Sequence, residues 1–350
     1  MSRKRILISI FLVVVVVWLV WQFHHSPEWK QFSLQKLWTA TSQAEGWYIA
    51  GSVVLIYASY LIRTWRWQAL MSPHGRFKPV LKGTVVGFTS LAFLGRAGEL
   101  VRPYYIGRKH SGLPPQLAVW VIERVFDMAG VVLLVGLDLV LSPSIKQLTR
   151  SNGLQSGMQK AGIIIMAGVA FIVILLVLFH RHSRGFLAFL HRRQERHPWS
   201  FRKRYMHFLE MLAEGLEGLR RGKTLLFACA MTVLLWVVVS GSMWAVVRAY
   251  PHMLPSFALS GGVLLMGLTA IGSVAQLPAV GGGFQVLTIF GLTKIFGAET
   301  TAATSAALVI WLVCFYAIAP WGVGLATHEG VSWRGLEEQA QDAEQSEPSP

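Results

Sequence analysis

The sequence predicts an all-α polytopic integral membrane protein with about six full spans and two broken or re-entrant helical regions. The 350 residues are 53% hydrophobic and only 14% charged, with a mean hydropathy of +0.49. Several apolar runs are long enough to cross the roughly 30 Å hydrocarbon core of a bilayer. So few charged residues cannot supply the water-facing surface of an ordinary soluble catalytic domain. The protein is therefore expected to act in or at a membrane.

The chain is strongly basic, with 32 Lys and Arg against 17 Asp and Glu and a formal charge of +15. In a membrane protein this excess indicates cytoplasmic loops and attraction to anionic headgroups, so we expect membrane lipids rather than nucleic acid as partners. The eleven histidines form no HExxH motif, and the two cysteines form no CxxC motif. The sequence thus predicts no metal site and no cofactor.

The first two predicted spans lie in the N-terminal fifth of the chain. A basic start is followed by an apolar run from Ile6 to Phe23, which is too long for a signal peptide and lacks a cleavage site. The second span runs from about Trp47 to Leu70. Its last turns carry Arg63, Arg66 and Trp67, the residue types that snorkel or anchor at a membrane surface, and we predict that they lie at the cytoplasmic interface.

The first interruption follows this span. An apolar piece from about Gly83 to Leu94 is short for a full crossing, and a charged segment from Gly95 to Arg108 follows it, which favours a broken or re-entrant helix. The next span, Leu117 to Leu141, carries three charged residues that no lipid-facing helix tolerates: Glu123, Arg124 and Asp127. That helix must face a protein interior or a polar cavity.

The second half repeats this pattern. After a span from Ala161 to Phe179, the loop at about 180–223 carries a net charge of +7, which predicts a cytoplasmic position. Apolar segments follow at about Leu225 to Val247 and Phe257 to Leu277. The second of these runs into Pro278 and three successive glycines, which cannot continue a regular helix and predict a second break.

A short apolar piece from Phe284 to Phe296 and a last span from about Ala302 to Ala326 complete the predicted membrane domain at 1–330. The acidic tail at 331–350 is predicted to be disordered. Both termini are expected in the cytoplasm, in a multi-pass protein of the plasma or inner membrane. An offset of about 186 residues aligns the segment starting at Gly95 with the segment starting at Gly281, which suggests an internal repeat.

The charged residues around the first break form the densest polar group of the sequence. Glu123 and Asp127 lie on one face of a helix, where two carboxylates repel unless a cation, a proton or an arginine lies between them. Two interpretations remain open: the charges lock two helices together, or the arginines bind a phosphate while the carboxylates balance them or take up protons. The candidate residues are Arg96, Glu99, Arg102, Glu123, Arg124 and Asp127.

The second break adds candidates of another kind. Glycines allow a ligand to approach the backbone closely, and the free N–H groups at a helix start attract anions. We therefore include Gly281, Gly282, Gly283 and Gln285 among the substrate-binding candidates. The alternative is a plain turn between helices. The run lacks the GxxxxGK[ST] pattern of a nucleotide-binding loop.

Taken together, these motifs resemble the flippase-like family, also called the lysylphosphatidylglycerol synthase transmembrane region, over roughly residues 5 to 330. The resemblance is carried by Arg63 to Trp67, by Gly95-Arg-Ala-Gly-Glu-Leu-Val-Arg-Pro103, by Glu123-Arg-Val-Phe-Asp127 and by the Pro- and Gly-rich run at 278–283. Gln285 departs from the family pattern, which has a glutamate there, so a proton-linked role of this position is not expected.

The resemblance implies a membrane protein that moves lipids or lipid-linked sugars between leaflets. The family's synthase activity belongs to a separate soluble domain, which we expect to be absent here, so we favour a function that is not enzymatic. The leading hypothesis is translocation of an anionic phospholipid or a lipid-linked phosphate or sugar. Two alternatives are an intramembrane transferase acting on polyprenyl-phosphate substrates and a non-transporting accessory subunit of a cell-envelope glycosyltransferase complex. We expect the two broken helices to meet near the midplane and to build a polar groove.

Overall fold

The computed structural model describes residues 34–71, 75–109, 112–143, 222–250, 252–254, 256–277 and 281–328, together with the isolated residues 160, 163 and 167–168. The predicted spans at 6–23 and 161–179, the basic loop at 180–223 and the tail at 331–350 lie wholly or almost wholly outside these residues. The number of full spans and the domain boundaries therefore remain predictions.

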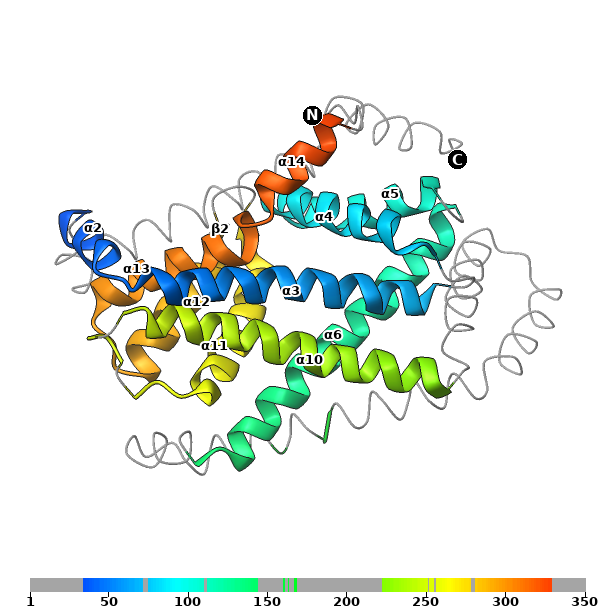
Figure 1. Ribbon diagram of the computed structural model, residues 1–350. Coiled ribbons are helices and arrows are strands. Elements are labelled where there is room, and N and C mark those ends of the chain that lie inside the picture. The colour runs from blue at the N-terminus through cyan, green and yellow to red at the C-terminus, as the bar shows by residue number, and fades with distance from the viewer. Residues whose placement is uncertain are drawn as a thin grey trace, which may run out of the picture.

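The described residues are almost entirely helical, which confirms the all-α prediction (Figure 1). The first half contains α2 (Leu34–Ser42), α3 (Gly46–Leu70), α4 (Phe77–Leu94), the 3-10 helix η1 (Gly95–Leu100), α5 (Val101–Lys109) and α6 (Leu113–Leu141). The second half contains α10 (Gly222–Arg248), α11 (Leu259–Gly272), the 3-10 helix η3 (Ser273–Ala275), α12 (Gly283–Phe290), the π-helix η4 (Gly291–Ile295), α13 (Thr300–Trp311), the π-helix η5 (Leu312–Tyr316) and α14 (Ala319–His328). Two short strands, β1 (Gln276–Leu277) and β2 (Gly281–Gly282), pair antiparallel.

Within the described residues, three stretches are long and apolar enough to cross a membrane: Phe77–Leu94, Gly222–Arg248 and Thr300–Leu325. The helices α3 and α6 are also long, at 25 and 29 residues, but carry the charged residues described above. At 1.5 Å per residue, both exceed the thickness of the hydrocarbon core. The described part of the chain is thus built as an all-α membrane protein.

The first break differs in length from the prediction. The helix before it begins at Phe77 rather than Gly83, so α4 has 18 residues and is not too short to cross. Gly95 then adopts a positive φ of 60°, and the chain turns back through η1 into α5. Gly83 packs against Ile106, Gly87 against Arg102 and Gly98 against the backbone of Ser90, so α4 and η1–α5 form an antiparallel helical hairpin.

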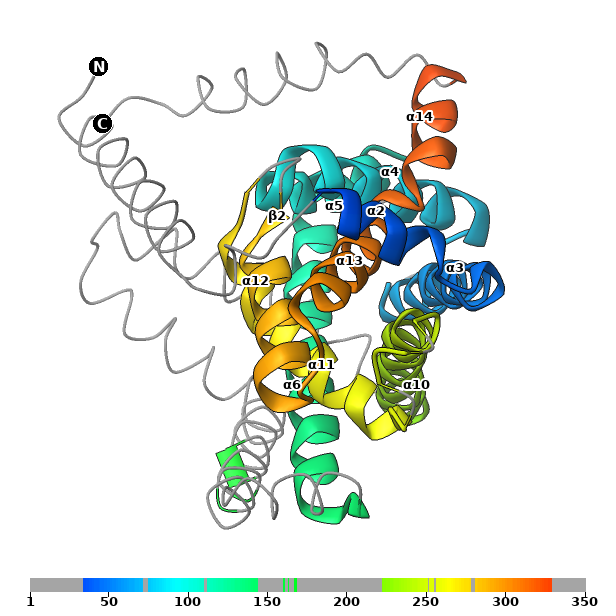
Figure 2. The ribbon, with the colours of Figure 1, turned by 90° about the vertical axis from the view of Figure 1, so that its left-hand side faces the viewer.

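The second break is a hairpin of the same kind. The apolar segment predicted to continue to Leu277 ends as an α-helix at Gly272, because Gln276 and Leu277 pair as a strand with Gly282 and Gly281. Gly272 lies against the carbonyl of Gly283, and Gly291 against Leu268, so α11 and α12 run antiparallel. Figure 2 shows the strand pair beside α12 and near α5, and β1 contacts η1. The two hairpin tips therefore meet.

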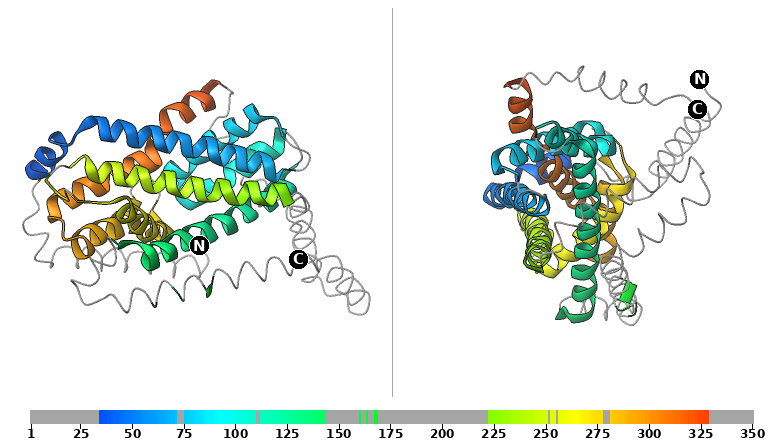
Figure 3. Two further views of the ribbon diagram at one scale, coloured as in Figure 1. Left: turned by 60° about the horizontal axis from the view of Figure 1, so that its bottom comes forward. Right: turned by 90° about the vertical axis from the view of Figure 1, so that its right-hand side faces the viewer.

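The order of elements agrees with an internal repeat. Each half has a long helix, α3 or α10, then a broken hairpin, then a further long helix, which is α6 in the first half and α13 to α14 in the second. The helices α3 and α10 pack side by side and antiparallel (Figure 3), with Ser52 bonded to Ser242 near one end and Arg66 to Thr232 near the other. Equivalent helices that run in opposite directions define an inverted repeat.

The main apolar core lies where α10 packs against the second hairpin and α13. Its fully buried side chains include Leu235, Leu265, Leu292 and Ile310. A second core cluster, which includes Trp67, Val80, Ile106 and Ile122, lies between α3, the first hairpin and α6. The first hairpin is therefore held against α3 and α6 by packing that excludes water.

The close approach within each hairpin predicts a sharp sensitivity to added side-chain atoms. A Cβ atom at Gly98 would overlap the backbone of Ser90, and one at Gly272 would overlap the carbonyl of Gly283. We expect Gly98→Ala and Gly272→Ala each to lower the free energy of unfolding by about 1–3 kcal/mol, measured by unfolding of the purified protein in detergent.

Gly51→Ala is the matched control, because no atom lies within 4 Å of the position of its Cβ. In that exposed helix position alanine should be neutral or stabilising, by up to about 1 kcal/mol. If Gly272→Ala proved as stable as Gly51→Ala, the described hairpin packing would be wrong.

Candidate functional site

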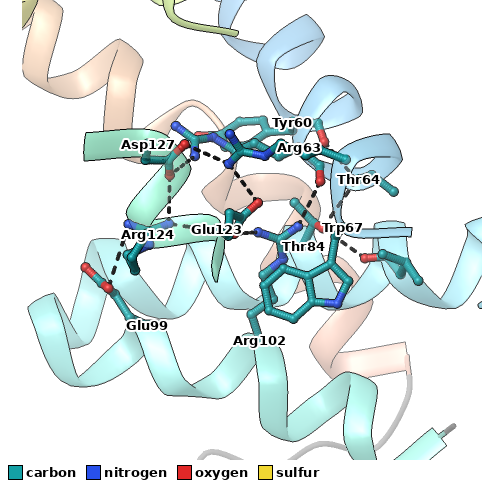
Figure 4. A network of polar contacts seen from close by, with 12 residues as sticks. Tyr60, Arg63, Thr64, Trp67, Thr84, Glu99, Arg102, Glu123, Arg124 and Asp127 are labelled. Atoms are coloured by element: carbon teal, nitrogen blue, oxygen red, sulfur yellow. Dashed lines mark hydrogen bonds and ion pairs between the residues drawn. The ribbon is translucent and has the colours of Figure 1, made fainter. Parts of the chain in front are cut away.

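Among the described side chains, four arginines and three carboxylates meet where α3, η1, α5 and α6 converge (Figure 4). We call this group the ion cluster; its members are Arg63, Arg66, Glu99, Arg102, Glu123, Arg124 and Asp127. The side chains of Arg66 and Glu123 are 0% exposed. Charges so deeply buried are stable only when they are paired with good geometry.

Arg66 lies between the two carboxylates of α6. Its Nη2 atom lies 2.7 Å from Oδ1 of Asp127 and 3.0 Å from Oε1 of Glu123. Glu123 and Asp127 are four residues apart on one helix face, where the sequence predicts that a cation, a proton or an arginine must relieve their repulsion, and Arg66 takes this place. Its Nη1 atom donates to the hydroxyl of Thr232 at 2.8 Å, which ties α10 to the cluster.

Arg102 is held by the first hairpin against the other side of Glu123. Its Nη1 atom donates to Oε2 of Glu123 at 2.7 Å, and its Nη2 atom donates to the carbonyl of Arg63 at 3.2 Å. The guanidinium lies 4.1 Å from the ring centroid of Trp67, in a cation–π contact. Arg102 thus has its edge bound to oxygen and its face covered by an aromatic ring.

Arg63 is held in a similar way. Its Nη1 atom lies 3.3 Å from Oδ2 of Asp127. Its guanidinium is 5.0 Å from the ring centroid of Phe88 and 5.4 Å from that of Trp236. The three buried arginines therefore act mainly on the protein itself: they join α3, α5 and α6.

Arg124 differs from the other three arginines. Its side chain is 33% exposed, and its ion-pair distances are 3.3 Å to Asp127 and 3.8 Å to both Glu99 and Glu123. None of these contacts is a hydrogen bond among the described residues, whereas Arg63, Arg66 and Arg102 each donate a hydrogen bond to a carboxylate. The Nε atom of Arg124 is buried without a partner, as are those of Arg66 and Arg102. A guanidinium has five N–H donors, so Arg124 retains donors for a further ligand.

Arg63, Arg66 and Trp67, which we predicted at the cytoplasmic interface, are 8%, 0% and 0% exposed and lie inside the cluster. The two carboxylates of α6 bind the arginines, so the side chains do not snorkel away from the protein. Their depth in the membrane stays a prediction. Trp65, on the opposite side of α3, is 46% exposed and has the position expected for an interfacial tryptophan.

The remaining predicted residues are distributed as follows. Arg96 lies in η1, but its side chain is outside the described part of the structure. Gln285 accepts a hydrogen bond from the N–H of Gly282 at 2.7 Å and so caps α12. Gly281, Gly282 and Gly283 build the second hairpin tip, and no described contact joins them to the ion cluster. The sequence analysis missed Thr232, Trp236 and Phe88, because nothing in the local sequence indicates that distant helices bring them to the arginines.

The fold and the site together define a class: helical membrane proteins with two broken hairpins in inverted halves and a buried ion cluster in the first half. The chain belongs to the family described as lysylphosphatidylglycerol synthase TM region, which matches residues 6–322. A comparison with the curated proteins found no match. The family places the protein in the membrane and links it to lipids.

The pairing predicts that Glu123 supports the fold more than Glu99 does. Glu123→Gln keeps the shape of the side chain but removes the only described carboxylate partner of Arg102 and one of the two partners of Arg66. We expect a loss of about 3–5 kcal/mol in the free energy of unfolding, measured by denaturant unfolding in detergent.

Glu99→Gln is the comparison, since Glu99 lies at the cluster's edge, 3.8 Å from Arg124. We expect this substitution to cost about 1 kcal/mol or less. Equal losses in the two variants would contradict the assignment of Glu123 to the centre of the cluster.

Proposed function

We propose that the protein is a lipid translocase that moves an anionic phospholipid or a lipid-linked phosphate between membrane leaflets. The observation that carries this proposal concerns Arg124, the partly exposed arginine of the ion cluster. Its guanidinium has N–H donors that make no hydrogen bond among the described residues. The family's link to lipids supports the same conclusion.

The chemistry of Arg124 fits a phosphate oxygen. Guanidinium groups bind phosphate through two parallel N–H donors, and these charge-assisted bonds are about twice as strong as neutral ones. Arg66 and Arg102 are committed to Glu123 and Asp127, so their role in the proposal is to position those carboxylates and hold α6 in place. We therefore assign ligand contact to Arg124 and not, as the sequence suggested, to Arg102.

The position of the cluster along α3 favours a lipid headgroup as the ligand. Trp47 and Trp65 are 66% and 46% exposed and lie 18 residues apart on this helix. At 1.5 Å per residue they are about 27 Å apart, close to the thickness of the hydrocarbon core, and tryptophan is enriched at both membrane surfaces. Arg63 and Arg66 flank Trp65, so the cluster would lie at the depth of the headgroups of one leaflet.

We propose that this leaflet is the cytoplasmic one. Exposed cations gather at the same end of the helices: Arg76 precedes α4, Lys78 lies in the first turn of α4, and Lys109 is the last residue of α5. An excess of Lys and Arg marks the cytoplasmic side. In this orientation both termini are cytoplasmic, the protein lies in the plasma or inner membrane, and the first hairpin enters from the cytoplasm while the second enters from the opposite side.

The inverted halves supply a means of transport. In transporters with inverted repeats, one half moves against the other and exposes a site to alternate sides of the membrane. Here the hairpin tips meet through β1 and η1, and η1 carries Glu99, the partner of Arg124. A movement of the second hairpin would thus shift η1 through its contact with β1, and would move Glu99 relative to Arg124.

The proposal predicts that Arg124→Gln abolishes transport without unfolding the protein. The test is the rate at which fluorescent phosphatidylglycerol, and separately a short polyprenyl phosphate, exchanges between leaflets in vesicles that contain the purified protein. Loss of a charge-assisted contact of about 1.5–3 kcal/mol corresponds to a roughly ten- to hundredfold fall in the rate of protein-mediated lipid exchange.

Lys78→Gln is the control, because it removes one exposed cation at the start of α4 that lies outside the ion cluster. It should exchange lipid at the wild-type rate. If correctly folded wild-type protein accelerated neither lipid, the translocase proposal would fail, and an accessory role beside cell-envelope biosynthesis enzymes would be favoured.

A further inference from the structure

The last apolar stretch of the described residues, Thr300–Leu325, is not one straight helix. It changes from the α-helix α13 to the π-helix η5 and then, after a turn, to α14, which leaves the direction of α13 (Figure 2). The N–H of Ala317 donates to the carbonyl of Leu312, five residues earlier, at 3.0 Å. Pro320 follows and has no N–H group to donate. Turns of π-helix and prolines are common causes of helix kinks, and π-helical turns are frequent at functional sites.

The two sides of this interruption pack against different parts of the molecule. α13 packs against α10 and α12, and its Ala306 and Ile310 lie in the main apolar core. α14 instead packs against α4 of the first hairpin, where Gly322 lies against the side chain of Thr89. We call residues 312–318 the joint. The joint therefore connects a helix that packs with the second hairpin to a helix that packs on the first.

Two tyrosines of α3 donate hydrogen bonds to carbonyl groups of the joint. The hydroxyl of Tyr57 lies 2.7 Å from the carbonyl oxygen of Ala317, and that of Tyr60 lies 3.3 Å from the carbonyl oxygen of Cys314. Where a membrane helix is interrupted, neighbouring side chains supply such hydrogen bonds to the backbone. The ring of Tyr57 also stacks on Trp321 of α14, with the ring centroids 6.1 Å apart. The long helix α3 thus holds the joint at two points.

The joint also lies close to the ion cluster and to the first hairpin. Tyr60 is about one helical turn from Arg63 on α3 (Figure 4), and its ring centroid lies 5.0 Å from that of Phe88. The ring of Phe88 in turn lies 5.0 Å from the guanidinium of Arg63. From the joint itself, the hydroxyl of Tyr316 donates to the carbonyl of Ala92, near the end of α4, at 3.1 Å. A movement of the joint would therefore change contacts of both.

From these contacts we infer that the joint is the hinge about which the two hairpins move relative to each other during transport, and that the hydroxyls of Tyr57 and Tyr60 hold it in the described conformation. This inference rests on the proposed function, because it assigns the movement of the inverted halves to one segment of the chain. Hinges are a few residues, often at the ends of elements, that absorb a change in backbone direction. Because Pro320 removes a ladder hydrogen bond, bending here costs less than bending within α13.

The test is the distance between the two sides of the joint, measured by pulsed electron paramagnetic resonance on the full-length protein in vesicles of phosphatidylethanolamine and phosphatidylglycerol. Spin labels are attached through Val286→Cys on α12 and Val323→Cys on α14, at side chains that are 39% and 40% exposed. Cys229→Ala and Cys314→Ala remove the two native thiols in every sample. We expect two distances, one for the described conformation and one for a conformation in which the joint has bent.

Hydroxyl removal tests the role of the tyrosines. Tyr57→Phe keeps the ring on Trp321, and we expect it to raise the ratio of the bent to the described conformation about fivefold. The double variant with Tyr60→Phe should raise it about 25-fold, because each neutral hydrogen bond contributes a similar factor. Tyr250→Phe is the matched control: its hydroxyl also has a hydrogen bond, at 2.8 Å to the hydroxyl of Ser305, but this contact joins the end of α10 to α13. It should lower the stability to unfolding and leave the ratio unchanged.

A single distance in the wild type and in all variants would overturn the inference. A ratio that Tyr57→Phe leaves unchanged, or that Tyr250→Phe raises equally, would also overturn it. Leaflet exchange of fluorescent phosphatidylglycerol and of a short polyprenyl phosphate, measured in the same vesicles, separates the two proposals. Exchange with a single distance would keep the translocase and refute the hinge. The expected shifts in ratio without exchange of either lipid would refute the translocase and keep the joint as a hinge.

Discussion

The arrangement of the first half of this protein depends on one bridging contact, that of Arg66 with Glu123 and Asp127. Two carboxylates on one face of a helix cannot be buried together unless a cation lies between them. Arg66 meets both within 3.0 Å and also binds Thr232 on α10. The same guanidinium thus neutralises the carboxylates of α6, fixes the position of α3 and joins the two halves of the molecule.

The remaining partners reach this contact because glycines allow the chain to fold back on itself. Gly87 has no side chain where the Cβ of Arg102 packs, and Gly95 takes a positive φ at the turn. The hairpin can therefore bring a third arginine from α5 to Glu123. Packing and electrostatics are coupled here. The close approach of α4 and α5 allows Arg102 to reach Glu123, and the ion pair offsets the cost of burying the arginine.

Much of the fold follows from local sequence properties. Hydropathy and run length identify the long helices, the change from apolar to charged residues locates the first break, and the Pro and Gly residues locate the second. The errors fall at helix ends: α4 begins at Phe77, so that Lys78 and Lys82 lie within it, and α11 ends at Gly272, after which Gln276 and Leu277 pair across a turn with Gly282 and Gly281. Hydropathy alone does not mark these ends, because polar residues can lie inside a helix and apolar residues can lie in a strand.

The sequence by itself determined the membrane class, the two interruptions and the residue types of the ion cluster, because hydropathy and charge act on each segment independently. It also indicated that a cation, a proton or an arginine lies between Glu123 and Asp127. Only the tertiary structure decided that it is an arginine and which one, since the choice among Arg63, Arg66, Arg102 and Arg124 depends on distances between helices. The same distances bury Arg63 and Arg66, bring Trp236 onto the cluster from the other half of the chain, and leave Arg124 as the partly exposed cation.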